Sequence, residues 1–108
     1  MREKFTKGPW KATYDSQLQA AIEIYNTEDR IRVALLPDRG TVEAMSEIEA
    51  NANLIAAAPD MYEALEAYVR LERDDILASL SPQELYNEYV ECKQKIHKAL
   101  RKARGETE

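Results

Sequence analysis

The feature that most constrains the fold is a proline within a long helical stretch, Pro59 in ANANLIAAAPDMYEAL. Proline inside a helix removes a hydrogen bond and clashes with the preceding turn, at a cost of about 3 kcal/mol. It is tolerated in the first turn of a new helix. The acidic residues that follow, Asp60 and Glu63, suit a helix start. The sequence therefore predicts two helices, at about 42–57 and 59–78, that meet at a corner.

Apolar residues in the first segment recur every three or four positions, which is typical of one helical face, and those in the second segment form the expected apolar stripe of its helix. The first series is Val42, Met45, Ile48, Ala52 and Ile55. The second series is Met61, Leu65, Tyr68, Val69 and Ile76. Thr41 is the expected N-cap of the first helix. The three alanines at 56–58 leave room for another element to approach closely where the two helices meet.

A third helix has the clearest start signal in the chain. In SPQE, Ser81 takes the N-cap, Pro82 the first helical position and Glu84 the third, which is a capping box. An apolar stripe follows at Leu85, Tyr89, Cys92, Ile96, Ala99 and Ala103. Gly105 is a natural stop. We expect this helix at about 82–104.

The first forty residues have the alternation of strands instead. AAIEIYN and IRVALLP flank the polar turn TEDR, which predicts a β-hairpin, and PWKATYD adds a further strand. In the second arm we expect Ile31, Val33 and Leu35 on one face and Arg30 and Arg32 on the other. Pro37 should end that strand.

Together these segments predict an α+β fold. A small three-stranded antiparallel sheet at about 10–36 packs on a helical hairpin, at about 42–57 and 59–78, with a long third helix at about 82–104. We expect one domain over 1–108, in which a β region at 1–40 precedes a helical region at 41–104 and a frayed tail at 105–108.

Composition excludes several classes of protein. The net charge of −5 argues against a protein-wide electrostatic grip on nucleic acid or anionic membrane. One cysteine, Cys92, allows no intrachain disulfide and suits a reducing compartment. The N-terminal residues lack the apolar core of a signal peptide, and no apolar run approaches the ~18 residues of a membrane span. We expect a soluble protein of the cytoplasm.

Catalytic chemistry has little support. Cys92 and His97 are five residues apart on one helix, so their side chains diverge by roughly 140°. One cysteine and one histidine make no ordinary zinc site. Asp74 and Asp75 are adjacent, without matching carboxylates, and suit a solvated helix end. Three scattered glycines make no phosphate-binding loop. We expect a protein that is not an enzyme and that binds neither a cofactor nor a metal ion.

The last helix carries six basic residues and no acidic one over 93–104. This run could contact nucleic acid or a membrane surface, or it could balance the acidic middle of the chain and suit the negative end of the helix dipole. The second interpretation is favoured, because the whole chain is acidic and no aromatic residues alternate with the bases.

Tyr86, Val90 and His97 form a second stripe on this helix, beside the first. A helix that is apolar on two sides is either more deeply buried in its own domain or packed against another copy. We expect a homo-oligomer, with a dimer favoured. The candidate interaction residues are Tyr86, Val90, Lys93, His97 and Arg101.

Two motifs resemble a known pattern. TKGPW, followed about forty residues later by EANANLIAAAPDMYEALEAY, resembles small proteins of tailed phages and prophages and is similar to the Ead-like early proteins of lambdoid phages. Lys7 departs from the proline usual in the first motif. The resemblance covers about two-thirds of the chain and stops before Pro82. It implies a phage accessory product, without catalytic or ligand residues to transfer.

The candidate structural residues are Trp10, Asn51, Asn53 and Pro59. Asn51 and Asn53 are costly in a helix if buried unpaired, so we expect them to hydrogen-bond the GPW segment at residues 8–10.

The first functional hypothesis is a non-enzymatic phage protein that binds a host or anti-phage-defence protein. One alternative is an oligomeric binder of nucleotide signals that uses Arg30, Arg32, Arg70 and the last helix. Another is nucleic-acid binding through the basic run at 93–104.

Overall fold

The computed structural model describes residues 4–15, 21–37 and 42–106. The strands are β1 (Trp10–Asp15), β2 (Ala21–Asn26) and β3 (Arg32–Leu36), and the helices are α1 (Val42–Ala56), α2 (Ala58–Leu71), α3 (Asp74–Ser79) and α4 (Pro82–Ala103). The strands form one antiparallel sheet in the order β1-β2-β3. The predicted α+β fold is confirmed. The expected N-cap, Thr41, lies outside the described residues.

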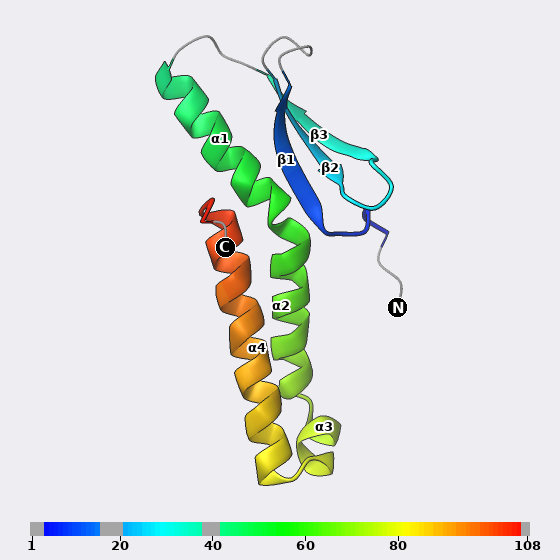
Figure 1. The fold of residues 1–108 in the computed structure, drawn as a ribbon. Coiled ribbons are helices and arrows are strands. Elements are labelled where there is room, and N and C mark those ends of the chain that lie inside the picture. Colours follow the sequence, from blue (N-terminus) through cyan, green and yellow to red (C-terminus); the bar gives the residue numbers. More distant parts are fainter. Residues whose placement is uncertain (1–3, 16–20, 38–41, 107–108) are drawn as a thin grey trace.

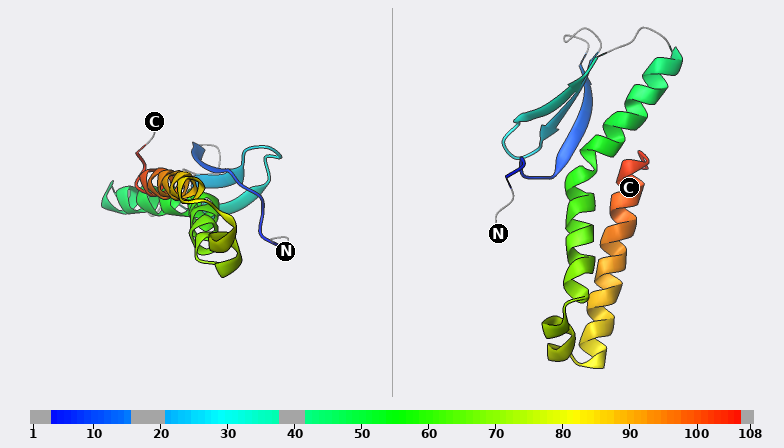
Figure 2. Two further views of the ribbon diagram at one scale, coloured as in Figure 1. Left: turned by 90° about the horizontal axis from the view of Figure 1, so that it is seen from below. Right: turned by 180° about the vertical axis from the view of Figure 1, so that it is seen from behind.

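The molecule is elongated, with extents of 55 × 27 × 19 Å. The sheet lies at one end, where α1 covers one of its faces (Figure 1). From there α2 and α4 run antiparallel as a long hairpin, and the short α3 lies at its far end (Figures 1 and 2). Most of the hairpin therefore has no third layer over it.

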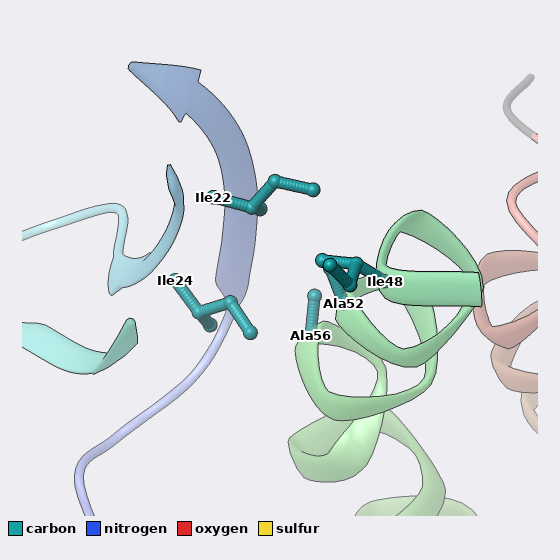
Figure 3. Close-up of a cluster of buried hydrophobic side chains, with 5 residues drawn as sticks. All are labelled: Ile22, Ile24, Ile48, Ala52 and Ala56. Atoms are coloured by element: carbon teal, nitrogen blue, oxygen red, sulfur yellow. The ribbon is translucent and has the colours of Figure 1, made fainter. Parts of the chain in front are cut away.

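The core lies between the sheet and α1. Ile22 and Ile24 point from β2 toward Ile48, Ala52 and Ala56 of α1 (Figure 3). Seven partly buried residues pack around this cluster: Trp10, Ala12, Val33, Ala34, Leu36, Met45 and Ile55. The predicted inner face of the first helix is thus confirmed at Met45, Ile48, Ala52 and Ile55, and the side chain of Val42 lies outside the part of the chain described. Burying each isoleucine contributes about 1.5–3 kcal/mol.

The hairpin of β2 and β3 forms as predicted, but β3 has a different phase. Ile22 pairs with Leu36 and Ile24 with Ala34, and a bulge follows. The extra residue, Val33, packs on the core while Leu35 is exposed. The alternation expected for Ile31, Val33 and Leu35 was therefore wrong, because a bulge shifts the two-residue period by one.

The corner at Pro59 is confirmed. Ala57 alone separates α1 from α2, and Pro59 lies in the first turn of α2. The Ala57 N–H donates to the Asn53 carbonyl at 3.1 Å, and the Met61 N–H donates to the Ala57 carbonyl at 2.9 Å. Ala57 is completely buried. The chain changes direction here (Figure 1).

The helix predicted at 59–78 is two helices instead. After Leu71 the Glu72 N–H donates to the Val69 carbonyl in a tighter turn, and Arg73 is extended, with ψ 132°. The Arg73 guanidinium then donates two hydrogen bonds to the Asp75 carboxylate, at 3.1 and 2.9 Å. Residues two apart do not face each other on a helix, so this pair fits a break. The Arg73 hydrogen bonds also lower the pKa of Asp75.

The capping box of α4 is confirmed. The Glu84 N–H donates to the Ser81 hydroxyl at 3.2 Å, and the Ser81 N–H donates to a Glu84 carboxylate oxygen at 2.9 Å. The backbone N–H of Ser81 lowers the pKa of Glu84. At the other end Gly105 has φ 78°, and the Glu106 N–H donates to the Arg101 carbonyl at 2.8 Å. Glu106 is therefore hydrogen-bonded to the helix end, where fraying was expected.

Candidate functional site

The predicted interaction residues lie along one side of α4. Tyr86 is 64% exposed, Lys93, His97 and Arg101 are exposed, and Val90 is half-buried. Steps of three and four residues along a helix keep these side chains on one side. The opposite side of α4 buries Cys92 and Ala99 against the rest of the fold. The structure thus brings the five residues into one row.

At the α3 end this row opens into an apolar groove of about 460 Å³, called here the tyrosine groove. Three helices line it, with Tyr68, Leu71, Glu72, Leu77, Pro82, Leu85, Tyr86 and Tyr89. Tyr68, Tyr86 and Tyr89 are all more than two-fifths exposed. The Lys93 ammonium lies beyond the groove, 5.6 Å from the centre of the Tyr89 ring. Tyrosines with an apolar ring and a polar tip are typical of protein interfaces.

A second apolar surface, called here the α2 strip, consists of Phe5, Tyr62, Leu65 and Val69. Leu65 is 65% exposed and Val69 is 58% exposed. Phe5, from the N-terminal segment, meets Tyr62 edge to face with ring centres 4.9 Å apart. The steps of three and four between the α2 residues place them on one face. Sequence reasoning missed this surface because it assigned Leu65 and Val69 to the buried stripe.

The face of α2 that packs on α4 is made of smaller residues than expected. Ala64 and Leu71 are buried, as is Ala57 just before the helix, so the buried positions repeat at intervals of seven residues. On α4 the buried Cys92 and Ala99 repeat at the same interval. Small side chains let two helices approach closely, and a seven-residue repeat keeps them facing each other. This repeat was the signal in the sequence for the true inner face.

The predicted structural residues have different partners from those expected. Trp10 donates its indole N–H to the Thr6 carbonyl at 3.0 Å and packs on the core. Pro59 is buried, with Gly8 against it. Asn53 lies beside Gly105 at the end of α4, and Asn51 is exposed. The GPW segment therefore packs against Pro59, and Asn53 lies next to Gly105 near the C-terminus instead of contacting that segment.

The arginines suggested for a ligand site already have carboxylate partners. Arg30 and Arg32 donate to the two oxygens of Glu23, at 3.0 and 2.9 Å. These bonds, that of Arg30 first, lower the pKa of Glu23. Arg30 also stacks on the Tyr25 ring at 3.7 Å. Arg70 reaches Glu88 at 3.4 Å between α2 and α4. An anionic ligand would have to displace these carboxylates.

A polar groove of about 630 Å³ runs between α2 and α4, with the buried Cys92 in its lining. Both signs of charge line it, in Glu63, Glu66, Glu88, Glu91, Arg70, Arg73 and Lys95. His97 is exposed, away from the Cys92 thiol, so the structure does not bring this pair together. Within the described residues no cluster of His, Cys, Asp and Glu could hold a metal ion.

Across the described ranges, no helix combines the length and the hydropathy that a membrane crossing needs.

The comparisons with known proteins agree with the predicted phage origin. The model of the family described as Salmonella phage P22 protein Y8K6 matches residues 1–107. No curated protein and no solved structure matches the chain. Because the match spans nearly the whole sequence, including the last helix that the two motifs do not cover, the chain belongs to the family of Salmonella phage P22 protein Y8K6.

Proposed function

We propose that this phage protein is a non-enzymatic accessory protein that binds a host or anti-phage-defence protein in the host cytoplasm. The α2 strip is the observation that carries the proposal. The likeness of the TKGPW motif and residues 50–65 to the Ead-like early proteins belongs to the same proposal, as the basis for an accessory role.

The α2 strip has the composition of a binding surface. Phe5 and Tyr62 supply two aromatic rings, and Leu65 and Val69 extend the apolar area along α2. Covering a Phe, Leu or Val side chain completely is worth about 1.5–3 kcal/mol. Aromatic residues are enriched among those that dominate binding energy. A partner that covers the strip therefore gains more there than on the charged surface around it.

Copurification from the bacterial host tests this proposal. The tagged full-length chain is compared with the double variant Leu65→Glu/Val69→Glu and with Leu54→Glu. Leu54 is a matched control, because it is 52% exposed but lies on α1. We expect a stoichiometric partner that binds the wild type and Leu54→Glu and is lost from the double variant. Absence of such a partner, or equal retention by all three proteins, contradicts the proposal.

Two alternative functions can each be tested by a separate experiment. A binder of nucleotide signals would use Arg30 and Arg32, and a rise in melting temperature with cyclic or ADP-ribose-type nucleotides would favour it. Nucleic-acid binding through the basic run at 93–104 would appear as retention of DNA or RNA at low salt. Both rank below protein binding, because Arg30 and Arg32 are held by Glu23 and the net charge is −5.

A further inference from the structure

The tyrosine groove shares no residue with the α2 strip, and it combines features that suit a second copy of the chain. We propose that two copies of the chain pair through the tyrosine groove, with their α4 helices antiparallel across a two-fold axis near Tyr89. The pairing goes beyond the proposed function and does not depend on a host partner.

The shape of the groove suits a two-fold contact. Such a contact joins the same patch of both copies, so the patch must contain both a projection and a hollow. Tyr86, 64% exposed, projects at the edge of the groove. The end of the hollow nearest Lys93 lies between Tyr68 of α2 and Tyr89 of α4. A two-fold axis near Tyr89 carries Tyr86, three residues toward the start of α4, to that end of the groove in the other copy. Tyr86 of each copy would fill the space beside Tyr68 of the other, which is the usual place of a dominant interface tyrosine.

The charges on this side favour the antiparallel orientation. The contact of Arg70 with Glu88 shows which levels of the antiparallel α2 and α4 lie side by side. In that register Glu72, which lines the groove, lies toward the start of α4 from Tyr89, and Lys93 lies one turn toward its end. A two-fold axis near Tyr89 brings Lys93 of each copy against Glu72 of the other. In the described part of the chain neither residue makes an ion pair, so both are available for this contact.

The isolated chain exposes more surface than a compact monomer of its mass. Its accessible area is 7973 Å², and its mass is 12.4 kDa. A compact monomer of that mass exposes roughly 6,100 Å². The radius of gyration is 17.3 Å, against about 13 Å for a compact domain of this length. A standard interface removes about 800 Å² from each partner, so the excess is large enough to supply one.

Sedimentation equilibrium of the full-length chain tests the surface. We expect the wild type to dimerise at micromolar concentrations and Tyr86→Ala to raise the dissociation constant roughly tenfold or more. Tyr14→Ala is the matched control, because Tyr14 is 55% exposed on β1. Circular dichroism shows whether each variant is folded. A wild type that stays monomeric, including one that captures another protein through Tyr86, overturns the proposal, as does a dimer that Tyr86→Ala leaves unchanged.

A charge exchange tests the orientation. Glu72→Lys and Lys93→Glu each place like charges together in the antiparallel dimer, so each should weaken it roughly threefold to tenfold. The double variant Glu72→Lys/Lys93→Glu restores an opposite pair and should return the dissociation constant close to the wild-type value. A double variant that is as weak as the single variants overturns the antiparallel arrangement. The copurification test above is independent, since it changes only α1 and α2 residues outside the groove.

Discussion

Gly8 packs directly against Pro59. A Cβ atom added to Gly8 would lie 2.6 Å from the Pro59 Cβ, which is closer than such atoms approach in folded proteins, and 3.1 Å from its Cγ. The N-terminal motif therefore touches the helical corner at a residue without a side chain. This contact gives a physical reason for TKGPW and the AAAPD segment to occur together, which the expected asparagine hydrogen bonds do not.

The first prediction is that Gly8→Ala destabilises the fold. The new methyl group must push the N-terminal segment off Pro59, and overpacking of this kind costs about 1–3 kcal/mol. Chemical denaturation followed by Trp10 fluorescence measures the loss, because Trp10 is the one tryptophan and is bonded to Thr6 in the same segment.

Lys7→Ala is the control for this measurement, since the Lys7 side chain is 81% exposed. Within the described residues its one ion pair is a 3.9 Å contact with Glu28, and exposed ion pairs of this kind contribute little to stability. Equal stability of Gly8→Ala and the wild type would show that the segment can move away from Pro59 at no cost.

Local signals predicted most of the fold. The capping box at Ser81, the proline at the start of α2 and the strand alternation of Ile22 and Ile24 each depend on neighbouring residues, and the structure has all three. The end of the helix after Leu71 was not predicted. It is accompanied by hydrogen bonds from the Arg73 guanidinium to the carboxylate of Asp75, two residues later in the chain. Nothing in the apolar spacing of 59–78 distinguishes that turn from a continued helix.

The interaction surfaces were harder to predict for a related reason. Hydrophobicity favours Leu65 and Val69 as the buried face of α2, whereas the approach of α4 selects Ala57 and Ala64. That choice is made by tertiary packing between segments far apart in the sequence. For the stripe of Tyr86, Val90 and His97 on α4, the sequence left burial in the same domain and contact with another copy as alternatives, and Tyr86 is 64% exposed.

The second prediction concerns the acid limit of stability. The Arg30 and Arg32 hydrogen bonds hold the pKa of Glu23 below its ordinary value of 4.5. A carboxyl with a lowered folded-state pKa stabilises the fold above its unfolded value and loses that contribution as the pH falls through the folded value. Glu23→Gln should therefore melt below the wild type at pH 7, and the gap should narrow as the pH falls below about 4.5.

Melting temperatures of both proteins from pH 7 down to pH ~3 provide this comparison. Glu49→Gln removes the same charge from an exposed site on α1 and should not lower the melting temperature at pH 7. A gap between Glu23→Gln and the wild type that stays constant over the whole range would exclude titration of Glu23 as the cause.

The third prediction is that Ser81→Ala weakens the start of α4. The variant removes the hydroxyl that accepts from the Glu84 N–H, and losing such a cap costs about 1 kcal/mol. For a domain of about this size, that loss lowers the melting temperature by roughly 4–8 °C. Ser79→Ala, also exposed but at the end of α3, should have a smaller effect. Ser81→Asp should retain most of the stability, and a loss equal to that of Ser81→Ala would argue against capping.

The last prediction addresses the corner between α1 and α2. Ala57 is completely buried there, on the side that packs against α4. Ala57→Leu should therefore push α4 away from the corner and lower the free energy of unfolding by about 1–3 kcal/mol. Ala50→Leu makes the same change at an exposed position of α1. Leucine and alanine are both good helix formers, so the pair of variants separates packing from helix propensity. Urea denaturation should show a lower midpoint for Ala57→Leu alone. Equal midpoints would mean that the corner has space for a larger side chain, and that the alanines at 56–58 do not serve close packing.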